Sequence, residues 1–133
     1  MKFILITLAM LTTNAFTMAD EFRREDLIRW QQEFDQAAKF GRELWTNAAP
    51  TKLGTNGVSC AQCHPNGSNT HPETYPKFQT HLSKVTTIWE MINWCIKNPL
   101  EGKVLAPDSK EIIALQAYIA SERKGVALAP GKH

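Results

Sequence analysis

The sequence lacks a strong charge of either sign, and we find in it no internal repeat and no low-complexity segment. It carries 15 Lys and Arg against 13 Asp and Glu, a formal net charge of +2. So even a balance gives no indication of nucleic-acid binding, and we expect no nucleic-acid partner. A chain of 133 residues without repeats is expected to form one small domain.

Long hydrophobic runs are also missing. The apolar stretch Phe3 to Leu11, preceded by Lys2, is too short to cross a bilayer as a helix. The small residues in Thr17-Met18-Ala19 suit a signal peptidase. We therefore expect residues 1–19 to be a signal peptide cleaved before Asp20, with no transmembrane segment in the mature chain. The alternative is an N-terminal membrane anchor that is never cut.

Cysteine is scarce, and the count of three is odd. In an exported protein, a thiol without a partner needs an explanation. Cys60 and Cys63 stand together in the motif Cys60-Ala61-Gln62-Cys63-His64. If this motif uses two thiols, Cys95 is the one that remains to be explained.

The Cys-x-x-Cys-His spacing is typical of covalent haem attachment. Two intervening residues let one turn present both sulfurs to the same porphyrin edge, where they add to the vinyl groups as thioethers. The next residue, His64, then points its imidazole at the iron. This attachment occurs outside the cytoplasm, in agreement with a signal peptide. The single motif predicts one haem c with His64 as proximal ligand.

Two other sites use closely spaced cysteines. A redox-active dithiol is expected within a βαβ pattern. A zinc site is expected to have a second Cys/His pair at close spacing. We find neither pattern around Cys60 and Cys63, so haem is the favoured interpretation.

Hydrophobic periodicity predicts three helices, over residues 21–45, 85–96 and 108–121. The apolar positions that we expect to face inward are Phe22, Ile28, Phe34, Ala38 and Leu44 in the first, Ile88, Ile92 and Ile96 in the second, and Ile112, Leu115, Tyr118 and Ile119 in the third. Asp108-Ser109-Lys110-Glu111 is a capping-box signal for the last helix. We expect loops over 51–60, 65–83 and 99–107 and a flexible tail over 124–133, and hence an all-α fold.

Two segments resemble the first and last helices of class I cytochromes c. They are Gly41-Arg42-Glu43-Leu44-Trp45 and Leu115-Gln116-Ala117-Tyr118-Ile119. In that family the last helix crosses the first at the glycine, where a missing side chain permits close approach. The resemblance implies a small class I cytochrome c-like helical fold wrapped around one covalently bound haem, with the domain over residues 20–123.

The distal iron ligand is less obvious. Class I cytochromes take a methionine from the loop before the last helix, but residues 97–107 contain none. Met91 is the only methionine after the expected cleavage site. Cys95 follows it by one helical turn, so both sulfurs lie on one face and either can be offered to the iron.

A narrower resemblance covers most of residues 57–120. Tyr75-Pro76-Lys77-Phe78, Met91-Ile92-Asn93-Trp94-Cys95 and Glu101-Gly102-Lys103 look like one haem domain of thiosulfate dehydrogenase and of the dihaem cytochromes of sulfur oxidation. There the matching segment reads Arg-Ile-x-x-Cys and its cysteine binds iron, which implies a Cys95 thiolate. This chain has Met91 in place of the arginine. The segment also resembles monohaem electron carriers of metal-respiring bacteria.

We predict Met91 as the distal ligand, with Cys95 as the alternative. A neutral thioether raises the reduction potential and suits an electron carrier, whereas a thiolate stabilises Fe(III) and lowers it. His71 and His81 are further distal candidates, although solvated loop histidines are the ordinary interpretation of both.

The residues thus predict a periplasmic monohaem c-type cytochrome that carries electrons between periplasmic redox partner proteins. The alternative is a haem enzyme, or a subunit of one, that oxidises thiosulfate through a haem ligated by the Cys95 thiolate. A haem that senses a small ligand is a third class.

Overall fold

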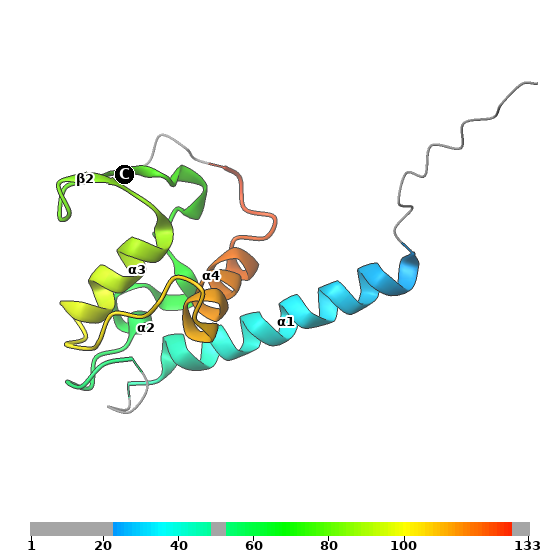
Figure 1. Ribbon diagram of the computed structural model, residues 1–133, viewed down its shortest axis with the longest axis horizontal. Coiled ribbons are helices and arrows are strands. Elements are labelled where there is room, and N and C mark those ends of the chain that lie inside the picture. The colour runs from blue at the N-terminus through cyan, green and yellow to red at the C-terminus, as the bar shows by residue number, and fades with distance from the viewer. Residues whose placement is uncertain (1–22, 49–52, 129–133) are drawn as a thin grey trace, which may run out of the picture.

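The computed structural model describes residues 23–48 and 53–128. The predicted signal peptide, its cleavage before Asp20 and the predicted inward position of Phe22 lie outside these residues. The elements, drawn in Figure 1, are α1 (Arg24–Thr46), α2 (Cys60–Cys63), the 3₁₀ turns η1 (Pro65–Gly67) and η2 (Pro72–Thr74), β1 (Lys77–Gln79), β2 (Lys84–Thr86), α3 (Ile88–Lys97) and α4 (Lys110–Glu122). The predicted, mainly helical class is confirmed. No helix in the described part is long and apolar enough to cross a membrane.

The framework of the fold is the crossing of α1 and α4. A Cβ at Gly41 would lie 1.9 Å from the carbonyl oxygen of Ala114 and 2.8 Å from the Cβ of Tyr118, so the two helices touch where α1 has no side chain. The four residues of α4 predicted to face inward, Ile112, Leu115, Tyr118 and Ile119, are each at most 2% exposed. This is the helix crossing that the class I resemblance implies.

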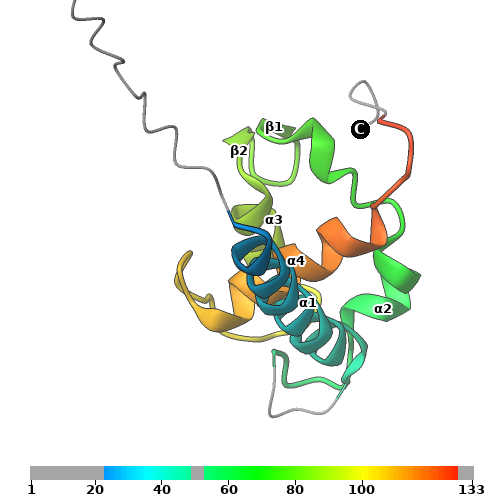
Figure 2. The same cartoon turned by 90° about the vertical axis from the view of Figure 1, so that its right-hand side faces the viewer.

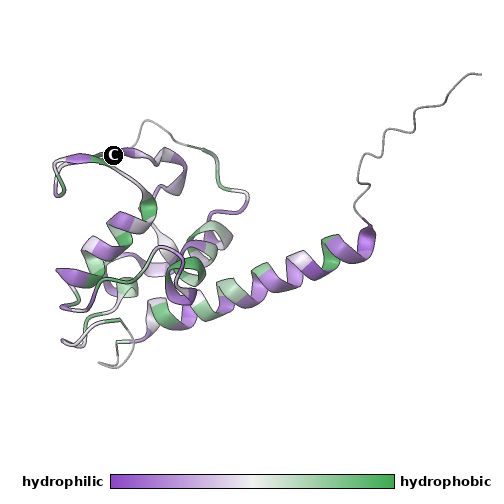
Figure 3. Cartoon of the chain, in the orientation of Figure 1, coloured by the Kyte–Doolittle hydropathy of each residue, from purple (hydrophilic) through white to green (hydrophobic). Residues whose placement is uncertain are grey.

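The N-terminal half of α1 differs from the prediction. Ile28 and Phe34, predicted to face the core, are 50% and 39% exposed, whereas Ala38 and Leu44 are buried. The reason is length, because α4 spans 13 residues and α1 spans 23. Figure 1 shows the start of α1 extending away from the other elements, and Figure 3 shows hydrophobic bands continuing along it.

The segment before α3 is also more ordered than predicted. The expected loop over 65–83 contains β1, which pairs with β2 in an antiparallel hairpin. Val85, predicted to begin a helix, lies in β2, and α3 begins only at Ile88. Thr87 caps α3 because Glu90 accepts hydrogen bonds from the Thr87 backbone N–H at 2.9 Å and hydroxyl at 3.0 Å. Figure 2 shows the resulting hairpin at one end of α3.

The last helix begins one residue later than the capping signal suggested. The N-cap is Ser109, whose hydroxyl accepts a hydrogen bond from the Ile112 N–H at 3.3 Å, instead of Asp108. The loop before it is held to α3 by buried Asn93, which exchanges two 2.9 Å hydrogen bonds with the backbone of Leu105. These contacts fix the loop that leads into α4 against α3.

Candidate haem site

The structure contains a cavity of about 410 Å³ between α2, α3 and the hairpin. Its wall is made by Trp45, Ser59, Cys60, Cys63, His64, Asn69, Thr70, Tyr75, Lys77, Gln79, His81, Ile88, Met91, Ile92, Trp94, Cys95, Pro99, Leu100 and Ile119. All five residues predicted to bind haem or iron are among these. The fold therefore brings together residues from two segments that the sequence separates by 27 positions or more.

The single-turn helix α2 presents the two attachment cysteines. The His64 N–H donates to the Cys60 carbonyl oxygen at 2.9 Å, which closes the turn between the two sulfurs. Cys60 and Cys63 are free thiols and form no disulfide. Burial, reinforced by the neighbouring Cys95 thiol, raises the pKa of Cys60 to about 12. Both thiols thus line the cavity, and the Cys60 thiol is in its neutral form.

His64 is oriented by two contacts at once. Its Nδ1 lies 2.9 Å from the carbonyl oxygen of Ser68. A carbonyl can only accept, so Nδ1 carries the hydrogen and Nε2 keeps its lone pair for a metal. The indole N–H of Trp45 donates to the His64 carbonyl oxygen at 2.9 Å. This arrangement fits a proximal ligand presented by a fixed backbone.

The two distal candidates lie on the α3 wall of the same cavity. Met91 and Cys95 are both partly buried there. Burial, together with the nearby Cys63 thiol, raises the pKa of Cys95 to about 11. Without a metal the Cys95 thiol therefore stays protonated, whereas the Met91 thioether has no proton to lose.

The other histidines fall in different places. His71 is not among the residues that line the cavity, and its Nδ1 lies 3.4 Å from the Glu73 carboxylate, which also pairs with Arg123 at 3.2 Å. His81 does line the cavity, and its ring centroid is 4.7 Å from that of Trp94. Of the two, only His81 shares the cavity with Met91 and Cys95.

Sequence reasoning gave no role to Tyr75 and Gln79, which line the cavity from the hairpin. The Gln79 side-chain amide donates to the Tyr75 hydroxyl oxygen at 2.8 Å. Lys77 lies between them, with its Nζ 4.9 Å from the centroid of the Tyr75 ring. The cavity-lining residues of this segment stand at the alternate positions 75, 77, 79 and 81, although only residues 77–79 form the strand β1.

These residues fit a haem attached through two thiols. The wall offers two adjacent free thiols, one oriented imidazole and two further sulfurs on the facing helix. The rest of the wall is largely apolar, as the face of a porphyrin requires. The donor set therefore matches haem c in kind and in arrangement.

Comparison with known proteins agrees with this geometry. The family model of the SoxA/TsdA cytochrome c domain matches residues 40–128, which is about two thirds of the chain. The chain belongs to the SoxA/TsdA cytochrome c domain family. Membership implies a covalently bound haem c and a c-type cytochrome role in electron transfer, and it confirms the resemblance to sulfur-oxidation cytochromes stated from the sequence.

Individual relatives of this SoxA/TsdA domain are larger proteins. The chain is 30% identical over 99 residues to the thiosulfate dehydrogenase of Psychrobacter arcticus, covering 66% of this chain and 30% of that enzyme. It shares the fold of SoxXA from P. pantotrophus, with a TM-score of 0.64 and 21% identity over 79% of this chain and 40% of that one. Thiosulfate dehydrogenase (TsdBA) from Marichromatium purpuratum gives a TM-score of 0.62 and 20% identity over 71% and 24%. The chain thus spans less than half the length of each.

Proposed function

We propose that this chain is a periplasmic monohaem c-type cytochrome that carries electrons between redox proteins. The observation that carries the proposal is the convergence of Cys60, Cys63 and His64 on one cavity. The motif occurs once in the sequence, which supports a single haem. The apolar N-terminal stretch and the chemistry of haem attachment support export, with residues 1–19 removed before Asp20.

Each residue of the site has a defined part in this proposal. Cys60 and Cys63 form the thioethers, and His64 Nε2 binds the iron from the proximal side. Met91 approaches from α3 as the distal ligand, because its long unbranched chain can extend past the turn occupied by Cys95. The domain extends over residues 20–123, and residues 124–133 form the tail.

The bound haem supplies the redox centre, and the protein needs to do little chemistry of its own. Ser68 and Trp45 hold His64 in place, so its orientation changes little with oxidation state. The apolar wall excludes water, which lowers the solvent reorganisation that accompanies electron transfer. This combination serves outer-sphere transfer.

The proposal is tested with the exported, haem-loaded protein. We expect a mass increase of one haem that is lost in Cys60→Ser/Cys63→Ser and retained in the control Cys95→Ser. We also expect rapid electron exchange with redox dyes and no steady-state turnover of small substrates. Sustained turnover of a small substrate would reject the carrier function.

A second function is favoured by the position of Cys95. The Cys95 thiol lines the same cavity as Cys63 and His64, and the nearby Cys63 thiol contributes to its raised pKa. A ferric ion can deprotonate such a thiol. In that case the chain would be a haem enzyme, or a subunit of one, that oxidises thiosulfate.

Assays with thiosulfate and an electron acceptor separate the two functions. Turnover that is lost in Cys95→Ala and kept in Met91→Ala would establish the enzyme. Inactivity of the intact, haem-loaded protein would leave the carrier function standing.

A further inference from the structure

The charges around the cavity are asymmetric. No Asp or Glu is among the described residues that line it, and Lys77 is the only lining residue with a permanent charge at neutral pH. Among the described residues, no carboxylate lies within ion-pair distance of the Lys77 ammonium group. The contrast is Lys84 on the paired strand, whose ammonium lies 2.5 Å from Glu90. Lys77 thus brings an uncompensated positive charge to the cavity edge.

Tyr75, which lies beside Lys77, has a hydroxyl hydrogen that is available for a hydrogen bond. Its hydroxyl oxygen accepts a hydrogen bond from the Gln79 amide, so the hydroxyl hydrogen must point elsewhere. No acceptor for that hydrogen is found in the described part of the chain. Burial raises the pKa of Tyr75 above its usual value, so the phenol keeps its proton at neutral pH. Tyr75 and Lys77 together offer one O–H and one ammonium group without acceptors.

A c-type haem brings acceptors of the matching kind. Its two propionate groups are carboxylates, and they hang from the porphyrin edge opposite the vinyl groups. Bringing a carboxylate into a largely apolar cavity is costly unless it is paired with a cation or accepts hydrogen bonds. The cavity wall supplies such groups through Lys77 and Gln79 of β1 and through Tyr75, which shortly precedes this strand.

We propose that Tyr75, Lys77 and Gln79 form a carboxylate-binding edge that holds a haem propionate. Tyr75 donates its O–H, Lys77 supplies the opposite charge, and Gln79 orients the phenol. The inference rests on haem binding in the proposed function, but on neither the carrier role nor the choice of distal ligand. The same donors would also suit a free oxyanion such as sulfite or thiosulfate, and the experiment separates these two sources.

The readout is the pH dependence of the reduction potential. Ionisation of a propionate stabilises Fe(III), so the potential falls as pH rises through the propionate pKa. The Lys77 cation keeps that pKa low. In Lys77→Gln the decrease of the reduction potential should therefore occur at a pH about one unit higher. That is the low end of the pKa shift that a close opposite charge causes. Tyr75→Phe should shift it in the same direction, and Lys77→Arg should restore the original profile.

Other titratable groups on the cavity wall must be separated from this effect. They are His81 on the hairpin, Cys60, Cys63 and His64 on the α2 side, and Cys95 on α3. The proposed function gives His81 no bond to the haem, so the comparison is made in a His81→Gln background. Lys84→Gln is the matched control, because Lys84 lies on the paired strand and does not line the cavity. The pH dependence of the reduction potential should be the same in Lys84→Gln as in the protein without this substitution.

Three results would overturn the inference. One is a haem-loaded Lys77→Gln protein with an unmoved profile, and another is an equal shift in Lys84→Gln. The third is a ferric spectrum that sulfite or thiosulfate perturbs in the wild type but not in Lys77→Gln, while the pH profile stays the same. NMR titration of the propionate methylene signals gives a second measurement that does not depend on potential. A chain that carries no haem would contradict the proposed function as well, whereas the three results above leave it intact.

Discussion

The indole of Trp45 donates a hydrogen bond to the backbone carbonyl of His64, with 2.9 Å between nitrogen and oxygen. Trp45 is 4% exposed and its ring also lies 5.6 Å, between centroids, from that of Tyr118. One side chain therefore ties α1, α4 and the predicted iron ligand together. The aromatic residue of the first-helix signature thus positions the haem site as well as filling the core.

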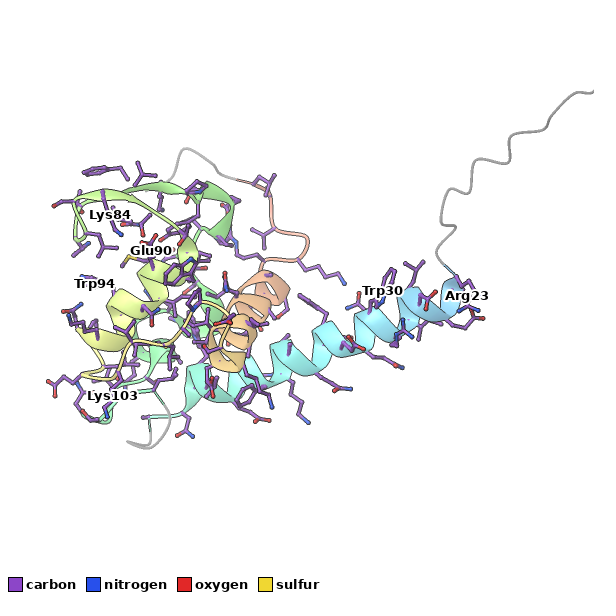
Figure 4. All side chains as sticks on the ribbon, viewed as in Figure 1. Arg23, Trp30, Lys84, Glu90, Trp94 and Lys103 are labelled. Atoms are coloured by element: carbon purple, nitrogen blue, oxygen red, sulfur yellow. The ribbon has the colours of Figure 1, made fainter. Side chains whose placement is uncertain are left out.

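Replacing Trp45 with Phe should destabilise the haem-loaded protein by about 1–3 kcal/mol. The His64 carbonyl would lose its donor in a partly buried position, which costs its desolvation as well as the bond. Chemical denaturation followed by haem absorbance measures the change. Trp30→Phe is the control, because Trp30 lies on the extended part of α1 (Figure 4) and should change stability by less than about 0.5 kcal/mol. Equal stability of Trp45→Phe and the wild type would contradict the role of this contact.

The two candidate distal ligands, Met91 and Cys95, predict opposite results for two variants. If Met91 binds the iron, Met91→Ala should open the site to added imidazole or CO and lower the reduction potential. Cys95→Ser should then leave the ferric spectrum unchanged and affect only packing. Absorption and EPR spectroscopy of the ferric protein make the comparison. A changed spectrum in Cys95→Ser beside an unchanged one in Met91→Ala would assign the ligand to the Cys95 thiolate.

Gly41→Ala has two opposing effects on the free energy of unfolding, one from helix propensity and one from packing. Alanine is favoured over glycine in a helix by about 1 kcal/mol. At Gly41 the added Cβ would lie 1.9 Å from the Ala114 carbonyl oxygen, so α1 and α4 must separate. We expect a net loss of about 1–3 kcal/mol in thermal or chemical unfolding. Gln36→Ala, on an exposed position of α1, should be neutral or slightly stabilising, and a stabilised Gly41→Ala protein would show that the crossing is not tight.

The cap of α3 predicts a pH dependence of stability. The Lys84 ammonium, with hydrogen bonds from Thr87 and Thr86, lowers the pKa of Glu90 to about 2, from an ordinary value of 4.5. A carboxyl with a lowered pKa stabilises the fold above about pH 4.5, and this contribution disappears as the pH falls toward 2. Glu90 and Lys84 meet at the junction of the hairpin and α3 in Figure 4.

Glu90→Gln should therefore be less stable than the wild type at neutral pH, and the difference should vanish near pH 2. Thermal unfolding midpoints from pH 2 to 7 measure it. Glu43→Gln, exposed on α1, should follow the wild type throughout. A difference for Glu90→Gln that stayed constant with pH would mean that the charge of Glu90 does not act in the cap.

The departures from the sequence predictions have a common physical origin. No local feature of the sequence around Val85 distinguishes a strand from the start of a helix. Val85 lies in a strand because it pairs with Phe78. Ile28 and Phe34 continue the hydrophobic pattern of α1, but burial also needs a partner, and α4 is too short to reach them. Periodicity reports which face is apolar, whereas the lengths of neighbouring elements decide how much of that face is covered.

The haem attachment motif could be predicted from the sequence alone, because Cys60, Cys63 and His64 stand within one turn and the motif needs no distant partner. It also narrowed the distal sulfurs to Met91 and Cys95, since both lie on one turn of a single helix. Only the tertiary structure placed those sulfurs on the same cavity as His64, and only it added the hairpin face of Tyr75 and Lys77. Such long-range placement depends on how the α1–α4 crossing and the hairpin pack together, which no local pattern of residues encodes.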